Sequence, residues 1–390
     1  MNSKDYITNK SFCPLPWTGF IVEPDGKIKN CILSSHPIGD LKTNTLNNIL
    51  HGDKNCEIKT AMLSKQNHTS CGGCYALEKN KKSFEIISSR VYYLRELKQV
   101  SLDTYSSVDN FDLKHIDARW SNLCNFACVY CDSTYSSKWA QELKQPIEKP
   151  SKERLDELKE YVYNNIENLT NVYLAGGEPL LMKENEKFLE LLLEKNPNIT
   201  IRVNTNLSRT QTRVFELLTK FKNVHWTISV ETLEKEFEFV RYGGVWSDFL
   251  ENLQTISKLN HIISFNMLWF LLNYKSLFST VDYLKRLGFH NNTFIIGPLH
   301  SPKHLNIKNL PQTIIDELKI ILSDRIGEKP GYFLEDGYKN LLNYLDTPFE
   351  KNLAYSKQQL QILDERRNKN LINTFPELCA ILNQEGTHYG

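Results

Sequence analysis

Residues 115–131 read HIDARWSNLCNFACVYC, a strand-like run that leads directly into three closely spaced cysteines, Cys124, Cys128 and Cys131. Three thiolates so close in sequence can hold one soft metal centre. An iron–sulfur cubane takes four ligands, so three cysteines leave one iron open unless a fourth comes from elsewhere. The alternative is a tight loop whose buried thiols bind nothing. We expect a metal centre at the end of this strand.

Beyond this loop, strand-like runs alternate with amphipathic helical patterns. Besides 115–120, the expected strands are 171–175, 200–204, 225–230, 262–268 and 293–296. Apolar residues recur at i, i+3, i+4 spacing, as in a helix, over 153–169, 186–194, 211–221, 246–259 and 277–287. Such alternation implies parallel strands with helical crossovers. The predicted fold class is α/β, a partial (β/α)6 TIM-like barrel; a doubly wound sheet fits the same periodicity.

The pattern divides the chain into four regions. Residues 1–82 predict a small cysteine-rich hairpin domain, in which GFIVEPDGKIKNCI (19–32) reads as two strands around a Pro-Asp-Gly turn. Residues 83–112 predict a helix and a linker, and 113–300 hold the alternating barrel pattern. Residues 301–390 read as a helical C-terminal region, which could pack on the barrel, shape a substrate site or mediate dimerisation.

Composition excludes several classes of protein. The 390 residues are 41% hydrophobic and 24% charged, which is unlike a disordered chain. Lys and Arg (47) balance Asp and Glu (46), so nucleic acid is not an expected partner. The apolar run 262–272 is shorter than the ~20 residues of a membrane span, and the start has no signal-peptide pattern. With nine cysteines, an odd number, we expect reduced thiols and a cytoplasmic protein without membrane association.

A second motif, Ala175-Gly176-Gly177-Glu178-Pro179, ends the second barrel strand. Ligand sites in parallel β/α folds gather at the carboxyl ends of strands. The two glycines let the backbone approach a ligand, and Glu178 offers a carboxylate to an ammonium group. A simple turn is the alternative. Because both loops lie at the same strand ends, the cysteine loop strengthens the ligand-binding interpretation.

Four cysteines of the first region, Cys13, Cys31, Cys71 and Cys74, have ligand-like placement across a hairpin and a Cys-Gly-Gly-Cys knuckle. They satisfy an all-thiolate zinc site as well as an iron–sulfur cluster. Cys56 is expected to be a spare thiol, and Cys379 a core residue of a C-terminal helix.

The Cys124–Cys131 loop resembles the cluster motif of the radical S-adenosylmethionine (radical SAM) superfamily. The resemblance implies that Cys124, Cys128 and Cys131 hold a [4Fe–4S] cluster whose open iron chelates SAM. Tyr130 then lies near the adenine, and the motif Gly176, Gly177, Glu178 and Pro179 holds the methionine amino group. Polar residues at later strand ends would meet the ribose and the methionine carboxylate; these are Asn206, Ser229, Glu231 and Arg241.

The N-terminal region resembles the SPASM and shorter twitch modules, which implies that Cys13, Cys31, Cys71 and Cys74 hold an auxiliary iron–sulfur cluster, expected to be [4Fe–4S]. Those modules usually follow the barrel, whereas this one precedes it, so its docking on the barrel is left open.

The resemblance implies reductive cleavage of SAM to a 5′-deoxyadenosyl radical, which abstracts hydrogen from a peptide, protein or small-metabolite substrate. The auxiliary cluster would accept an electron or ligate the substrate, and a flavodoxin or ferredoxin would supply electrons. The alternatives are a zinc-stabilised binding protein without catalysis, an electron carrier, and a nucleic-acid-modifying radical SAM enzyme.

Overall fold

A computed structural model describes residues 8–79, 88–95, 102–327 and 332–384. The chain forms two compact units, and each is built from several segments. The first unit comprises Met1–Cys124, Ser133–Asn204 and Gln211–His225. The second comprises Asn125–Asp132, Thr205–Thr210 and Trp226–Gly390. The three-cysteine loop therefore begins in the first unit and continues in the second.

The sheet of the first unit joins the N-terminal hairpin to the first barrel strands. Its strands are β3 (Gly39–Asp40), β2 (Lys27–Lys29), β1 (Gly19–Val22), β4 (His115–Ala118), β5 (Asn171–Leu174) and most of β6 (Thr200–Thr205), in that order. β1 is antiparallel to β2 but parallel to β4, with Gly19 opposite His115 and Val22 opposite Ala118. The hairpin thus extends the barrel sheet at β4.

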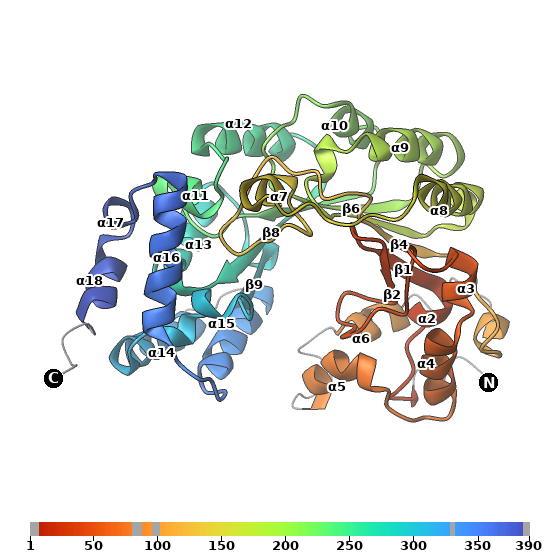
Figure 1. Cartoon of the computed structure of the whole chain (residues 1–390), viewed down its shortest axis with the longest axis horizontal. Helices are drawn as coiled ribbons and strands as arrows, with labels where there is room; N and C mark the ends of the chain where they lie inside the picture. Colours follow the sequence, from red (N-terminus) through yellow and green to blue (C-terminus); the bar gives the residue numbers. More distant parts are fainter. Residues whose placement is uncertain (1–7, 80–87, 96–101, 328–331, 385–390) are drawn as a thin grey trace. The chain divides into compact units, whose positions relative to one another are not determined.

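Short helices pack around this hairpin. They are α2 (Leu15–Thr18), α3 (Leu46–Leu50), α4 (Asp53–Leu63), η1 (Thr69–Cys71), α5 (Gly72–Lys79) and α6 (Ser89–Leu94), drawn in red to orange in Figure 1. Thr45 and Ser88 cap α3 and α6 through their side chains. Trp17, Ile28 and Met62 are fully buried, so the N-terminal region has a hydrophobic core of its own.

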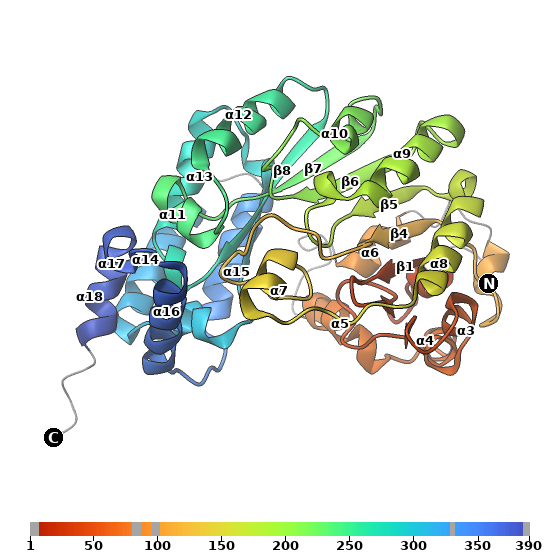
Figure 2. The same cartoon turned by 45° about the horizontal axis from the view of Figure 1, so that its top comes forward.

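The barrel helices of the first unit are α7 (Ser137–Leu143), α8 (Lys152–Asn164), α9 (Lys183–Lys195) and α10 (Arg213–Leu218). Figure 2 shows α8, α9 and α10 lying along the strands β5 and β6. α8 buries Leu158 and Val162, and α9 buries Phe188 and Leu192, each on one face of an amphipathic helix.

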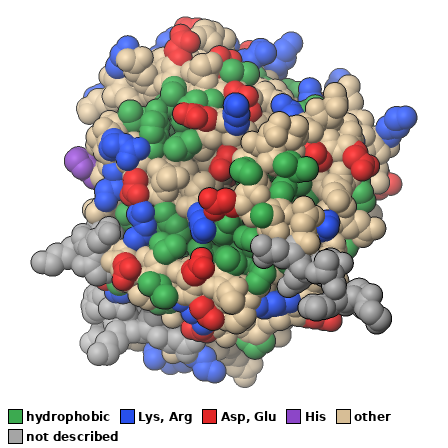
Figure 3. Space-filling view, turned by 90° about the vertical axis from the view of Figure 1, so that its left-hand side faces the viewer, with side chains coloured by type: hydrophobic (Ala, Val, Ile, Leu, Met, Phe, Trp, Pro, Cys, Tyr) green, Lys and Arg blue, Asp and Glu red, His purple; other side chains and the backbone are tan. Residues whose placement is uncertain are grey.

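The second unit holds most of β7 (Val224–Ser229), with β8 (Ile262–Trp269) and β9 (Phe294–Pro298), and β8 and β9 are parallel. Its helices are α11 (Glu234–Val240), α12 (Trp246–Ser257), α13 (Ser276–Arg286), α14 (Gln312–Gly327), α15 (Tyr332–Leu345), α16 (Leu353–Arg367), α17 (Leu371–Thr374) and α18 (Pro376–Gln384). On the face shown in Figure 3, basic, acidic and hydrophobic side chains are interspersed, in keeping with a net charge of +1.

The α/β prediction is confirmed. All six barrel strands form, and the strand order runs from β4 to β9 in sequence order, after β3, β2 and β1. The predicted hairpin and the helical C-terminal region also form. The predictions omitted the short helices α7 and α11 and the pairing of β1 with β4. Residues 83–87 and 96–101 of the predicted helix and linker lie outside the described residues. Among the described helices, none has the length and apolar character to cross a membrane.

Candidate active site

The loop after β4 is fixed by hydrogen bonds up to its first cysteine. The Ser137 hydroxyl accepts from the Cys124 N–H and lies within hydrogen-bond distance of the Cys124 carbonyl oxygen, at 3.1 Å in each case. Ser137 in turn donates its N–H to the Asn122 carbonyl at 2.6 Å. Ser136 caps α7 through its side chain. The start of α7 therefore fixes the backbone at Cys124.

The glycine motif after β5 lies directly against this loop. Gly177 N–H donates to the Ser121 carbonyl at 3.2 Å, and Glu178 N–H to the Leu123 carbonyl at 2.7 Å. A Cβ atom on Gly177 would lie 2.2 Å from the Leu123 oxygen, which no side chain tolerates. Gly176 has φ +106°, a conformation that favours glycine. Both glycines are therefore needed for the two loops to meet.

Glu178 lies in the same contact region, with an exposed fraction of 1%. Its Oε1 accepts from the Leu180 N–H at 3.1 Å and so caps the turn Pro179–Leu181. Pro179 is buried at the first position of that turn. The first unit thus brings together Cys124, the two glycines, Glu178 and Pro179.

In the second unit, the remainder of the cysteine loop is bound to the segment after α11. Ala127 N–H donates to the Tyr242 carbonyl and Val129 N–H to the Val240 carbonyl, both at 2.8 Å. Cys131 N–H donates to the Cys128 carbonyl at 3.0 Å, which closes a turn between the last two cysteines. Residues 240–242 therefore set the conformation around Cys128.

A buried ion pair lies beside Cys128. Arg241 donates to Glu231 through Nε (2.8 Å) and Nη2 (2.6 Å), and its Nη1 lies 3.8 Å from the Cys128 Sγ. The Tyr130 hydroxyl donates to Glu231 Oε1 at 3.0 Å. Burial raises the pKa of the Tyr130 hydroxyl well above its usual value. Tyr130, Glu231 and Arg241, which we expected to face a cofactor, are therefore bound to one another around this cysteine.

The other two candidates lie at strand ends. Asn206 directly follows β6 and donates from Nδ2 to Asn125 Oδ1 at 3.2 Å, so it touches the cysteine loop within the second unit. Ser208 donates to the same oxygen at 3.2 Å. Ser229 is the last residue of β7 and is half-buried. Neither Asn125, which lies within the cysteine loop, nor Ser208, which follows β6, was predicted as a site residue from the sequence.

The four N-terminal cysteines line one small cavity, of about 20 Å³, in the first unit. Cys13 precedes α2, Cys31 follows β2, Cys71 ends η1 and Cys74 lies in α5. The remaining lining residues are Leu15, Leu33, Met62, Tyr75, Ser89 and Arg90. The structure thus brings together the four cysteines that the sequence singled out.

In this cavity, burial disfavours the charged thiolate form of the cysteines unless a metal is bound. Burial, followed by repulsion between the thiols, raises the pKa of Cys31 to about 11 and that of Cys71 to about 12. Burial also raises the pKa of Cys74. A hydrogen bond from the backbone N–H of Arg90 lowers this pKa, but by less than burial raises it. Metal binding would offset this penalty, because a metal ion stabilises the thiolate.

A buried arginine closes one side of the same cavity. Arg90 donates from Nε to Glu78 Oε1 at 3.0 Å and from Nη1 to the Phe12 carbonyl at 3.3 Å, and its exposed fraction is 7%. Ser88 also donates to Glu78. Arg90 carried no local sequence signal, because the cysteines that line the same cavity precede it by up to 77 residues.

The remaining cysteines lie outside both groups. Cys56 is in α4, where its Sγ donates to the His51 carbonyl at 3.4 Å, and it does not line the cavity. Cys379 is buried in α18, as predicted. No disulfide joins any of the nine cysteines, all of which are among the described residues. In the described ranges, no group of His, Cys, Asp and Glu is placed closely enough to hold a single metal ion.

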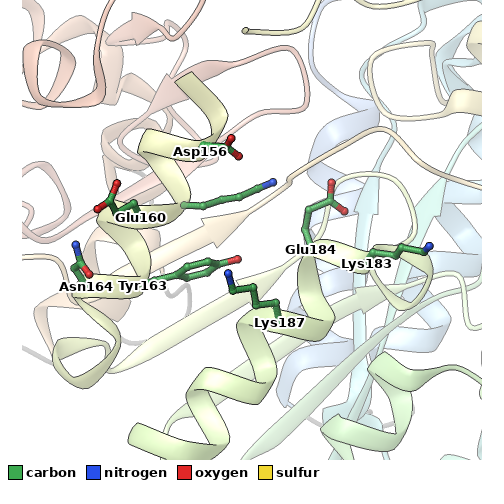
Figure 4. Close-up of a pocket in the computed structure, with 8 residues that line it drawn as sticks. Asp156, Glu160, Tyr163, Asn164, Lys183, Glu184 and Lys187 are labelled. Carbon is green, nitrogen blue, oxygen red and sulfur yellow. The ribbon is translucent and has the colours of Figure 1, made fainter. Parts of the chain in front are cut away.

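A further cavity, of about 580 Å³, lies between α8 and α9 (Figure 4). Lys187 Nζ lies 5.3 Å from the centre of the Tyr163 ring. The lining mixes three lysines with three carboxylates: Asp156, Lys159, Glu160, Tyr163, Asn164, Lys183, Glu184 and Lys187. This balance of charge favours neither an anionic nor a cationic ligand.

Comparison with protein families gives two matches. Residues 119–304 match the model of the Radical SAM superfamily, and residues 13–75 match that of an iron–sulfur cluster-binding domain, SPASM. The chain is 26% identical over 232 residues to a GTP 3′,8-cyclase of Campylobacter lari, covering 55% of this chain and 67% of that protein. It is 24% identical over 247 residues to a GTP 3′,8-cyclase of Aliarcobacter butzleri, covering 60% and 73%.

Solved structures give weaker similarity. Native anSMEcpe with bound AdoMet has a TM-score of 0.41 at 17% identity, covering 55% of this chain and 60% of that one. SuiB of Streptococcus suis bound to S-adenosylmethionine has a TM-score of 0.40 at 15% identity, covering 70% and 64%. The chain therefore spans less than two thirds of either solved chain.

Proposed function

The chain is a radical SAM enzyme with a SPASM iron–sulfur module, and we propose that it abstracts hydrogen from a carbon atom of a peptide, protein or small metabolite. When bound, a [4Fe–4S] cluster with one open iron supplies the electron that splits SAM into methionine and a 5′-deoxyadenosyl radical. The observation that carries the proposal is the three-cysteine loop after β4, held against the Gly-Gly-Glu-Pro turn after β5.

The donor set of each cysteine group fits its cofactor. Cys124, Cys128 and Cys131 supply three thiolates, which leaves a coordination position for SAM. Cys13, Cys31, Cys71 and Cys74 surround one cavity, so four thiolates are available to the auxiliary cluster.

The residues of the first unit would bind the methionine part of SAM. Gly176 and Gly177 bring the backbone against the loop of Cys124, and Glu178 offers a carboxylate to the amino group. Its burial strengthens such a contact, because a charged hydrogen bond is stronger away from water. Pro179 fixes the turn that aims this carboxylate.

Four further residues would contact SAM. Tyr130 would lie against the adenine, while Asn206 and Ser229 offer polar atoms to the ribose. Arg241 binds Glu231 through Nε and Nη2, and its remaining N–H groups would donate to the methionine carboxylate. The ion pair supports this role, since it holds the arginine beside Cys128.

The auxiliary site would accept an electron rather than bind the substrate. Four cysteines complete the coordination of a cubane and leave no iron open. Net oxidation of the substrate follows if the substrate radical gives its electron to this cluster and a proton to solvent. A flavodoxin- or ferredoxin-type donor would supply the first electron. The odd number of cysteines supports a cytoplasmic location.

Anaerobic reconstitution tests this proposal. The wild-type protein should bind iron and sulfide and release 5′-deoxyadenosine when dithionite and SAM are added. Replacing Cys124, Cys128 and Cys131 together by alanine should abolish that product. Zinc without sulfide would support a non-catalytic binding protein, and iron and sulfide without SAM cleavage would support an electron carrier; either result would overturn the proposal.

The relatives named GTP 3′,8-cyclase make GTP the first small molecule to test. If GTP is the substrate, 5′-deoxyadenosine formation should rise with GTP concentration, and GTP should be consumed in equal amount. Formation that stays independent of GTP would direct the search to peptides and proteins.

A further inference from the structure

A buried carboxylate at the end of β1 is bound from two sides. Glu23 directly follows β1, and its exposed fraction is 3%. Lys29 Nζ, at the end of β2, lies 3.2 Å from Glu23 Oε1. The other oxygen, Oε2, accepts from the Tyr135 hydroxyl at 2.9 Å and from Arg119 Nη1 at 3.4 Å. Each oxygen of Glu23 therefore binds a different segment of the chain.

The partners of Oε2 flank the three-cysteine loop. Arg119 directly follows β4, five residues before Cys124, and Tyr135 follows Cys131 by four residues. Asp117 fixes the Arg119 guanidinium through two hydrogen bonds, of 2.8 and 2.7 Å. The guanidinium carbon of Arg119 lies 5.9 Å from the centre of the Tyr135 ring. One carboxylate thus connects the chain before the loop to the chain after it.

The partner of Oε1 belongs to the N-terminal cysteine region. Lys29 ends β2 two residues before Cys31, which lines the cavity of the four cysteines. Glu23 itself lies in the segment that matches the SPASM model, whereas Arg119 and Tyr135 lie in the segment that matches the Radical SAM model. Within the first unit, Glu23 therefore links the two cysteine-bearing segments.

We propose that Glu23 is a positioning residue, which acts through Arg119 and Tyr135 to hold the three-cysteine loop in the conformation that binds SAM. A single carboxylate suits this task, because hydrogen bonds to a charged acceptor are stronger than neutral ones and burial strengthens them further. The inference deepens the proposed function and rests on it. It also gives the N-terminal module a part in SAM binding besides the binding of its own cluster.

The substitution Glu23→Gln separates the two links. A carboxylate accepts hydrogen bonds on both oxygens, whereas an amide accepts on its oxygen and donates from its nitrogen. The glutamine side chain can therefore serve Lys29, or Arg119 with Tyr135, but not both sides at once. Tyr135→Phe removes one hydroxyl from the same contact and leaves the charges around it in place.

The first measurement is SAM binding by the reconstituted full-length protein, followed by the change that SAM causes in the electron paramagnetic resonance signal after reduction with dithionite. In Glu23→Gln, the SAM concentration at the half-maximal change should rise about tenfold, the equivalent of about 1.4 kcal/mol. In Tyr135→Phe it should rise by a smaller factor. The double variant should match Glu23→Gln alone, because both residues act through one contact. Iron and sulfide contents should equal those of the wild type in all three variants.

The second measurement does not depend on SAM. Amide hydrogen exchange of residues 119–124 and 133–136 in the reconstituted, SAM-free protein should be faster in Glu23→Gln than in the wild type, while that of α9 should be unchanged. The matched control is Asp25→Asn, which breaks an ion pair with Lys27 inside the same hairpin. It should match the wild type in both measurements.

Unchanged SAM binding or unchanged exchange in Glu23→Gln, or equal changes in Asp25→Asn, would overturn the inference. If Glu23→Gln fails to bind iron, Tyr135→Phe decides between the same outcomes, because it leaves every charge of the contact in place. Failure of the proposed function looks different, because then the wild type itself shows no response to SAM.

Discussion

The N-terminal cysteine site draws its four thiols from three separate segments, whereas the barrel cysteines all lie within residues 124–131. The first site depends on the fold, since Cys13 reaches Cys74 only after the hairpin and the short helices have packed. The second depends on a single loop, and the fold supplies its supports instead: a glycine turn in the first unit, and Arg241 and Tyr242 in the second. The two sites also differ in their number of thiols, because four thiols complete the coordination of a cubane and three leave a position for SAM.

The largest expected effect is the loss of activity when the contact between the glycine turn and the cysteine loop is disturbed. Gly177→Ala places a Cβ atom 2.2 Å from the Leu123 oxygen, so the two loops must separate. We expect 5′-deoxyadenosine formation to fall below detection while the auxiliary cluster is retained. The matched control is Gly297→Ala, where a Cβ atom would meet nothing within 4 Å, and its activity should equal that of the wild type. Full activity of Gly177→Ala would mean that the close contact of the two loops is not needed.

The next prediction distinguishes the task of the N-terminal cysteine site from that of the barrel cysteines. Replacing Cys71 and Cys74 by alanine should remove about four of about eight irons per chain, as expected for the loss of one of two cubanes. SAM cleavage should persist, because the barrel cysteines are intact, whereas turnover of a true substrate should stop. Iron and sulfide analysis beside the deoxyadenosine assay checks this, with Cys56→Ala as the control that leaves both sites complete. Loss of SAM cleavage as well would show that the barrel loop depends on the N-terminal fold.

The sequence predicted those parts of the molecule that local patterns specify. All six barrel strands and the main helices have long periodic signals, and the cysteine and glycine motifs lie at strand ends as expected. α7 and α11, of seven residues each, were omitted. The pairing of Gly19 with His115 was out of reach, since no local pattern links strands so far apart in the chain. Arg90 was missed for the same reason, because its contacts with Glu78 and the Phe12 carbonyl form only in the folded chain.

A smaller effect concerns the ion pair beside Cys128. Glu231→Gln leaves the buried Arg241 without its counter-charge, which in comparable buried pairs costs about 3 kcal/mol of stability. Urea unfolding followed by tryptophan fluorescence measures this loss. Glu216→Gln breaks an exposed contact with Arg213 and should leave the unfolding midpoint unchanged. Equal midpoints for the two variants would mean that the Glu231 pair is no more important for stability than a surface pair.

The smallest effect probes the seam where the N-terminal hairpin joins the barrel sheet. His115 pairs with Gly19 across β1 and β4, and burial, with a smaller effect of Lys114, lowers its pKa to about 3. An unfolded histidine has a pKa of about 6.5. Between these values the unfolded chain binds a proton that the folded chain does not. The contribution of His115 is therefore complete above pH 6.5 and is lost as the pH falls towards 3.

At about 1.4 kcal/mol for each pH unit below 6.5, His115 should account for about 2 kcal/mol of the stability lost between pH 7 and pH 5. Urea unfolding of the holoenzyme at both pH values should show a smaller loss in His115→Gln than in the wild type. Some loss should remain in that variant, since burial also lowers the pKa of His225, to about 4. The exposed His51 serves as the control, and His51→Gln should behave as the wild type. If His115→Gln lost as much stability as the wild type, protonation of groups other than His115 would account for the loss.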